Sequence, residues 1–360
     1  MKDKTQNRAG GIKKALLITL VSLLCLSVIN GCVTVVIYNS FFERHERPDY
    51  SVTPGLCYYG RVEDSLPREQ MYFTSGDVEL CGYYYPCDNP LGLVVFAHGY
   101  RAGADDYLAL ISEIVHSGYA LFTYDVRGTY SSGGDSVVGM CQSLLDIDAA
   151  LDFITSDEKY NDMPIFLIGH SWGGYAVSSV LALHPEVSAC VCIAPMADGA
   201  TVMVEMAEIY AGEIVNVSKP VFDIYQEYLF GEYTNYNAVY GINSTDIPIL
   251  IAQGVDDDVI TMDKLSITAF SDLITNPNVE YYYADGLQGG HSEILYSTEA
   301  LEYREQISTE LSRLTDELGR ELTAEEMSEF YSKVDHDLYS DINPELLSLI
   351  LQTFEKGINS

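Results

Sequence analysis

The chain has 360 residues, of which 48% are hydrophobic, and this is enough apolar material for one large buried core. Its 19 basic and 53 acidic residues give a net charge of −34. Such an acidic surface repels nucleic acid, so we predict no DNA or RNA partner.

Residues 15–38 are uncharged and dominated by Leu, Ile and Val, and five Lys and Arg residues precede them. A helix of about 20 apolar residues spans the hydrocarbon of a bilayer, and basic residues favour the cytoplasmic side. We therefore predict a cytoplasmic N-terminus at residues 1–14 and a single-pass transmembrane anchor at residues 15–38. The remaining chain is then extracytoplasmic at the cell membrane.

Two alternatives to this anchor remain. The run I-N-G-C at residues 29–32 loosely resembles a lipobox, which predicts a lipoprotein lipidated at Cys32. The other alternative is a cleaved signal peptide, although the apolar run is long for one.

Residues 39–67 contain several Pro and Gly breakers and are predicted to be a linker, followed by one domain at residues 68–360. Strand and helix patterns then alternate along the chain. Strands are expected at residues 71–74, 78–85, 92–97, 119–124, 164–169, 189–194, 247–253 and 279–284. Helices are expected at residues 105–116, 142–155, 172–184 and 261–273. This alternation predicts an α/β fold with a mostly parallel central sheet flanked by helices.

Two further features concern cysteine. None of the eight cysteines has zinc-site spacing with partner histidines, so we predict no metal site. Cys81 and Cys87 flank a short Tyr-rich run, and a disulfide between them is an open possibility if the domain lies outside the cell.

The strongest motif is G-H-S-W-G-G at residues 169–174. It matches G-x-S-x-G and lies between an apolar strand and a helical stretch, which is the setting of a nucleophile elbow. Small residues at positions 169 and 173 let the backbone segments cross closely. Ser171 is therefore the candidate nucleophile.

Two backbone N–H groups are candidates for an oxyanion hole. One belongs to Trp172, directly after the candidate nucleophile, and the other to Tyr100, in the loop that follows the strand at residues 92–97. Since this chemistry uses backbone groups, we interpret the nearby side chain of His98 as structural.

An acidic loop and a histidine complete the candidate site. The run Q-G-V-D-D-D-V-I at residues 253–260 closes a strand, and Asp257 is the candidate acid, with Asp256 as the alternate. His291 lies in a loop after the last strand, where it can serve as the general base. The order Ser, Asp, His along the chain is the one expected of this fold class.

These motifs resemble the α/β-hydrolases, nearest to the serine aminopeptidase and monoacylglycerol-lipase-like branch. The resemblance is carried by H-G at residues 98–99, D-V-R-G-T-Y-S at 125–131, the 169–174 motif, Asp257 and His291. In the second of these motifs Tyr130 replaces a usual glycine. The resemblance implies a serine hydrolase that cleaves a small ester, amide or peptide substrate and needs no cofactor.

The resemblance also places a helical cap at about residues 195–246, while residues 296–341 are predicted to be a charged helical insertion before a terminal helix at 343–356. Met203, Tyr210 and Tyr225 are candidate substrate-binding residues in the cap, and Met206 and Phe222 share its apolar character. Each of these residues is equally compatible with cap core. Two other functions stay open, a catalytically silent binding protein at the cell surface and a lipase acting on acylglycerols.

Overall fold

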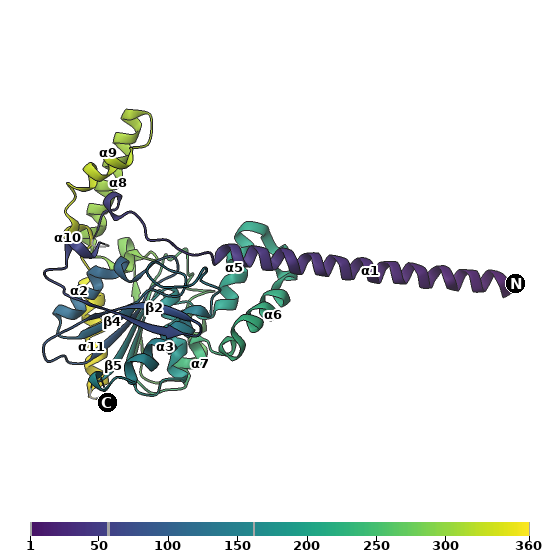
Figure 1. Ribbon diagram of the computed structural model, residues 1–360, viewed down its shortest axis with the longest axis horizontal. Helices are drawn as coiled ribbons and strands as arrows, with labels where there is room; N and C mark the ends of the chain where they lie inside the picture. Colours follow the sequence, from purple (N-terminus) through teal and green to yellow (C-terminus); the bar gives the residue numbers. More distant parts are fainter. Residues whose placement is uncertain (1, 56–57, 161–162, 360) are drawn as a thin grey trace.

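The computed structural model describes residues 2–55, 58–160 and 163–359, and the side chains of residues 2–12, 206–207, 209–211 and 213–214 lie outside this description. An eight-stranded sheet forms the centre of the molecule, in the order β1-β2-β4-β3-β5-β6-β7-β8 (Figure 1). The strands are β1 Glu69–Ser75, β2 Val78–Tyr85, β3 Leu93–Ala97, β4 Ala120–Tyr124, β5 Ile165–His170, β6 Val187–Ile193, β7 Ile249–Gly254 and β8 Val279–Ala284.

The sheet is parallel from β4 to β8, while β2 pairs antiparallel with both β1 and β4. The helices are α1 Lys2–Phe41, α2 Leu108–His116, α3 Gln142–Thr155, α4 Trp172–Ser179, α5 Gly199–Ala211, α6 Lys219–Phe230, α7 Ala238–Asn243, α8 Thr298–Leu318, α9 Ala324–Tyr331, α10 His336–Tyr339 and α11 Pro344–Ile358. The predicted fold class, a mostly parallel sheet flanked by helices, is confirmed.

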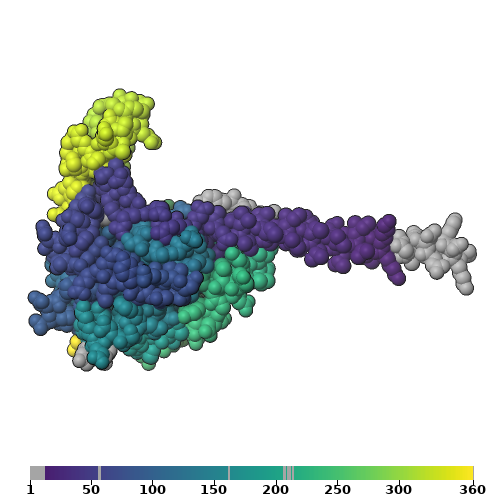
Figure 2. Space-filling view, in the orientation of Figure 1, coloured from purple at the N-terminus to yellow at the C-terminus, as the bar shows by residue number. Residues whose placement is uncertain are grey.

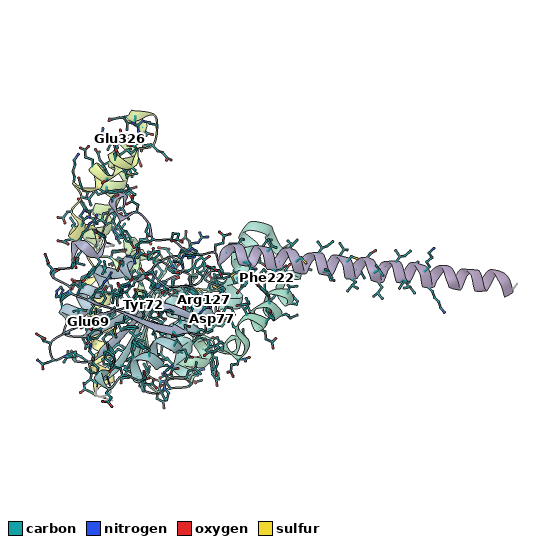
Figure 3. The ribbon with its side chains drawn as sticks, viewed as in Figure 1. Glu69, Tyr72, Asp77, Arg127, Phe222 and Glu326 are labelled. Atoms are coloured by element: carbon teal, nitrogen blue, oxygen red, sulfur yellow. The ribbon has the colours of Figure 1, made fainter. Side chains whose placement is uncertain are left out.

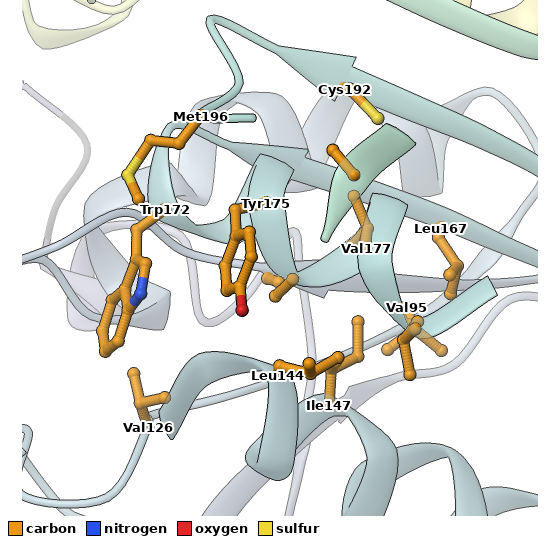
Figure 4. Packing of buried hydrophobic residues seen from close by; sticks show 14 of the residues in the cluster. Val95, Val126, Leu144, Ile147, Leu167, Trp172, Tyr175, Val177, Cys192 and Met196 are labelled. Carbon is orange, nitrogen blue, oxygen red and sulfur yellow. The ribbon is translucent and has the colours of Figure 1, made fainter. Parts of the chain in front are cut away.

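Helices cover both faces of the sheet, so its central strands are buried on both sides. On β3, Val95 contributes to the core beneath α3 and α4, whereas Val94 and Phe96 contribute to the core beneath α2 and α11. This two-sided burial explains the continuous apolar run of the strand. Figure 4 shows the first core, where Leu144 and Ile147 of α3 lie beside the strands near Val95 and Leu167.

Helices α5 to α7 are inserted between β6 and β7 and form the cap. Helices α8 and α9 form the charged insertion, which projects away from the sheet (Figure 1). Helix α11 returns to the sheet, where the ring of Phe354 stacks on Phe166 at 4.6 Å between centroids.

Helix α1 projects from the domain as a long rod beside the cap (Figure 2). Within the described residues, its segment Lys13–Phe41 is the one helix long and apolar enough to cross a membrane, with a mean hydropathy of 2.4. This test rests on length and composition only, and a signal sequence near an N-terminus passes it as well. The helix continues without interruption through Cys32.

Residues 39–67, predicted as a linker, pack against the domain over much of their described length. Isolated bridges join Glu43 to Ser136 and His45 to Thr129. Further along, Arg47 binds the buried carboxylate of Asp105 at 2.7 Å, and Arg68 binds its other oxygen. The Pro and Gly residues of this segment predict irregular backbone. They do not predict that the segment is held against the domain, because the buried acid that binds it, Asp105, lies elsewhere in the sequence.

One other expectation differs from the structure, and one open possibility is not realised in it. The helix expected at residues 261–273 forms only as a 3-10 helix at Ile267–Leu273, because the Thr261 carbonyl closes a turn over residues 264–266 and Ser266 then caps a new start. Cys81 and Cys87 are both free thiols, so the structure contains no disulfide between them.

Candidate active site

The candidate nucleophile lies in a strained turn between β5 and α4. Ser171 has φ of 56° and ψ of −113°, a backbone conformation that non-glycine residues rarely adopt. Its N–H donates to the Ile193 carbonyl at 2.8 Å. A methyl group on Gly173 would lie 2.0 Å from the Ala97 carbonyl oxygen, and one on Gly169 would lie 2.2 Å from that of Gly173. Both glycines are thus required by close backbone crossings around the serine.

The structure brings Ser171, His291 and Asp257 together in one hydrogen-bonded series. His291 Nε2 lies 3.0 Å from Ser171 Oγ, and His291 Nδ1 lies 2.8 Å from Asp257 Oδ2. With the carboxylate accepting from Nδ1–H, Nε2 is free to accept the serine proton. This arrangement can activate a hydroxyl as a nucleophile.

Asp257 is held as an anion by several donors. Burial alone would raise its pKa, but the hydrogen bond and charge of His291 and the backbone N–H groups of Ile260 and Val259 outweigh burial and lower the pKa. The amide of Gln253, itself fully buried, donates to Asp257 Oδ2 at 2.9 Å. Asp256, the alternate acid, is exposed.

The two residues that supply the predicted oxyanion donors, Tyr100 and Trp172, contact each other through their rings. The rings of Tyr100 and Trp172 meet edge to face at 5.9 Å, and Trp172 Nε1 donates to the Met140 carbonyl at 2.7 Å. Within the described part of the chain, neither the Tyr100 nor the Trp172 backbone N–H has a hydrogen-bond acceptor. Both donors therefore remain available to a ligand.

The side chain of His98 links two backbone segments. Its Nε2 accepts from the Val126 N–H at 3.0 Å, so Nδ1 carries the proton and donates to the Gly99 carbonyl at 2.8 Å. Burial lowers the pKa of His98 to about 4 and keeps it neutral. The side chain fixes the loop that presents Tyr100.

A second hydrogen-bond series, which the sequence reasoning missed, joins the three loops of the site. The Gly99 N–H donates to the Tyr107 hydroxyl at 3.1 Å, leaving that hydroxyl to donate to His170 Nδ1 at 2.9 Å. His170 Nε2–H then donates to the His291 carbonyl at 3.1 Å. Burial, with the charge of His291 adding to it, lowers the pKa of His170 to about 3, so the ring stays neutral. His170 was visible inside the 169–174 motif, whereas nothing in the pattern around Tyr107 distinguished it.

The candidate substrate-binding residues fall in different places. Met203 is buried in the core. Tyr225 packs on α1, where its ring lies 5.2 Å from that of Tyr38 and its hydroxyl donates to Asn39 at 3.1 Å. The side chain of Tyr210, like that of Met206, lies outside the described part of the structure.

A cavity of about 600 Å³ lies between the cap and the residues Cys141 and Tyr175. Its lining is polar and includes the acidic side chains of Asp198, Asp223 and Glu227. Its lining includes none of Ser171, Asp257 and His291, so we assign it no part in the reaction. Within the described residues, no group of three or more His, Cys, Asp or Glu residues is arranged to hold a metal ion.

Comparisons with known proteins find related sequences and related folds. Residues 88–240 match the family model described as serine aminopeptidase, S33, a range that contains Ser171 but ends before Asp257 and His291. The chain is 27% identical to mouse monoglyceride lipase over 148 residues, covering 41% of this chain and 49% of that protein. It is 30% identical to a monoglyceride lipase homologue of monkeypox virus over 112 residues, covering 31% and 40%. The chain thus spans about half the length, or less, of these relatives.

Among solved structures, an esterase from Pyrococcus furiosus superposes with a TM-score of 0.52 at 18% identity, covering 77% of this chain and 98% of the esterase. A likeness at this identity concerns the fold alone. Together with the strand–serine–helix turn, it shows that this chain has the α/β-hydrolase fold, and its sequence is similar to the branch that includes monoglyceride lipase and serine aminopeptidase.

Proposed function

We propose that the protein is a serine hydrolase that cleaves ester bonds through an acyl-enzyme intermediate. The observation that carries this proposal is the uninterrupted series from Asp257 through His291 to Ser171 Oγ, at 2.8 and 3.0 Å. A catalytically silent relative has no need to keep three side chains in this register, so the geometry disfavours the alternative of a pure binding protein.

The reaction follows from the positions of these groups. His291 Nε2 takes the Ser171 proton as Oγ bonds to the carbonyl carbon, and the resulting oxyanion receives hydrogen bonds from the Tyr100 and Trp172 N–H groups. His291 then returns the proton to the leaving group, which departs as an alcohol. Water deprotonated by His291 attacks the acyl-enzyme and releases the acid, restoring Ser171.

An ester is the substrate class that the relatives favour, since their printed names are those of a monoglyceride lipase and its homologue. An amide or peptide substrate is the second candidate, favoured by the serine aminopeptidase description of the family model. The net charge of −34 favours neutral or cationic substrates over anionic ones.

We further propose that α1 anchors the enzyme as a single-pass helix, with its basic N-terminal end in the cytoplasm and the hydrolase domain outside. Support comes from the apolar length of Lys13–Phe41 and from its exposure, since only 6% of its most apolar window is buried. The five Lys and Arg residues before position 15 favour this orientation.

Labelling by a fluorophosphonate probe tests the proposed chemistry. The full chain in detergent micelles is expected to be labelled and to hydrolyse a short-chain nitrophenyl ester, while Ser171→Ala loses both. Ser292→Ala, which removes an exposed hydroxyl next to His291, serves as the matched control and keeps both. Failure of the folded wild-type protein to react with probe or ester would favour the silent binding protein.

A further inference from the structure

The last turns of the anchor helix are buried inside the hydrolase domain. Thr34, Tyr38 and Phe42 are 4%, 0% and 1% exposed, and their spacing of four residues places them along one face of α1 and its continuation. Tyr38 packs against Phe222 and Tyr225 of α6. The helix end is therefore part of the domain core as well as the end of a rod.

The carbonyl end of α1 contacts the loop that follows β3 and carries Tyr100. The final carbonyls of an α-helix lack partners within the helix. The Tyr100 hydroxyl donates to the Phe41 carbonyl, and the Phe42 ring meets the Tyr100 ring edge to face at 6.0 Å. Tyr100 in turn contacts Trp172. One side chain thus connects the anchor to both predicted oxyanion donors.

A second connection runs through the segment that precedes α3. The Val137 N–H donates to the Phe42 carbonyl at 2.9 Å. The Tyr38 hydroxyl lies so close to Gly139 that a methyl group there would be 2.0 Å away. The next residue, Met140, accepts the indole N–H of Trp172. The helix end therefore also supports the residue that follows the nucleophile.

The chain leaving the helix continues this support. His45 N–H donates to the Gly128 carbonyl at 2.9 Å, and the Tyr130 N–H donates to the His45 carbonyl at 2.9 Å. Arg44 binds the carbonyls of Tyr130, Ser132 and Gly134 at 2.6 to 2.9 Å. These contacts lock residues 42–45 onto the loop that follows β4.

From these contacts we propose that residues 38–45, the anchor end, are a positioning element of the oxyanion hole, acting through Tyr100 and through Met140 and Trp172. The inference rests on the proposed serine-hydrolase function. Oxyanion donors act only when held within about 0.5 Å of their productive positions, and a surface loop needs outside support to stay there. In this chain the membrane anchor supplies that support.

Phe42→Ala in the full chain tests the proposal, measured with a water-soluble short-chain ester in detergent micelles. Misplacing a donor is milder than removing it, which costs about 10²–10³ in kcat, so we expect kcat to fall about 10- to 100-fold. KM should stay within about twofold because the donors act mainly in the transition state. The pH profile of kcat should keep its midpoint, because Asp257 and His291 are untouched.

Two further variants separate positioning from general damage. Phe354→Ala removes the same ring from a fully buried site on α11, and it is expected to lower thermal stability with kcat within about twofold of wild type. Tyr100→Phe keeps the ring and the backbone donor but removes the bond to Phe41, and it is expected to lower kcat about 3- to 10-fold. This milder variant tests the proposal if Phe42→Ala does not fold.

The outcomes are distinct. A folded Phe42→Ala or Tyr100→Phe protein with wild-type kcat would overturn the positioning role, as would equal losses of kcat in Phe42→Ala and Phe354→Ala. A wild-type protein that neither binds the fluorophosphonate probe nor hydrolyses esters would instead refute the proposed function itself.

Discussion

The Asp257 carboxylate is fixed by three kinds of donor: the His291 ring, the Gln253 amide and two backbone N–H groups. Asp257→Asn would preserve the shape but present an amide to His291 Nδ1 and favour the wrong tautomer. In a serine protease the same change lowers kcat about 10⁴-fold, so we expect a loss of about 10³–10⁴ in ester hydrolysis. Asp256→Asn, at the exposed neighbour, should stay within about twofold. Equal effects of the two changes would contradict the assignment.

We predict that the buried carboxyl group of Asp146 makes the free energy of unfolding depend on pH. Its carboxylate accepts from Ser75 Oγ, Gln142 Nε2 and the Arg127 N–H at 2.6 to 2.8 Å, yet burial dominates and raises its pKa to about 6. Because this pKa lies above the unfolded value near 3.8, the folded state keeps its proton to higher pH. The associated stability is therefore present at low pH and is lost as pH rises through about 6.

Thermal unfolding of wild type and Asp146→Asn at pH 5 and pH 7.5 measures this effect. Over this range the wild-type protein should lose about 1 kcal/mol of stability that the variant does not lose. Asp125, whose pKa burial also raises to about 6, is common to both proteins and cancels in the comparison. Parallel pH dependence in the two proteins would show that Asp146 ionises normally.

Tyr130 shows how a departure from a family pattern is accommodated. It stands where the family usually has glycine, and its φ of 43° is one that glycine adopts freely. Its hydroxyl donates to Asp106 at 2.7 Å, and its ring lies 5.4 Å from the Arg47 guanidinium. The side chain thus gains contacts with Asp106 and Arg47 that glycine would lack.

At the scale of elements, the regular parts of the fold were predictable because each depends on a local pattern. The strands β2 and β8 have the predicted bounds, and the serine turn follows from two glycines placed between a strand and a helix. The residues that support the site were not predictable in this way. Tyr107 and His170 meet across 63 residues, and Phe42 meets Tyr100 across 58, so no local periodicity signals their contacts.

The segment that follows α1 illustrates the same limit. Its Pro and Gly residues predict irregular backbone, and in its described residues the structure has short 3-10 turns at Tyr50–Val52 and Tyr59–Arg61. What composition does not reveal is the buried Asp105 carboxylate, which binds both Arg47 and Arg68. An unpaired buried charge is costly, so the pairing of Asp105 with Arg47 holds the segment against the domain, and Arg68, directly after the segment, pairs with the same carboxylate.

At the scale of the whole molecule, the length of α1 limits how far the domain can stand from a membrane. Contact with the cap begins at Asn30, which accepts from Ser218 at 3.0 Å. The free helix at residues 15–29 is about 22 Å long, less than the roughly 30 Å of bilayer hydrocarbon. If α1 crosses the bilayer as proposed, the turns that pack on α6 must lie within or at the edge of the membrane.

The cap surface next to the end of α1 exposes large apolar side chains, as expected of a surface at the edge of a membrane. Val217, Ile224 and Tyr228 are 71%, 67% and 82% exposed beside the helix end, where Val33 and Val36 are exposed as well. Asp223 and Glu227 on the neighbouring face of α6 limit insertion to the headgroup region, because carboxylates are not carried into hydrocarbon without cost. The cap edge is therefore expected to lie at the membrane–water interface.

Tryptophan fluorescence in brominated lipid provides the measurement, because the chain has a single, buried tryptophan, Trp172. Tyr228→Trp should be quenched by lipids brominated near the headgroup, whereas Tyr72→Trp should not. Tyr72 is 54% exposed on β1 and lies farther than Phe222 from the free end of α1 (Figure 3). Equal quenching of the two variants would contradict a specific placement of the cap edge, and no quenching of Tyr228→Trp would mean that the domain stands clear of the bilayer. That result would also require α1 to sit differently in the membrane, since its free turns are too short to span it while the cap remains in water.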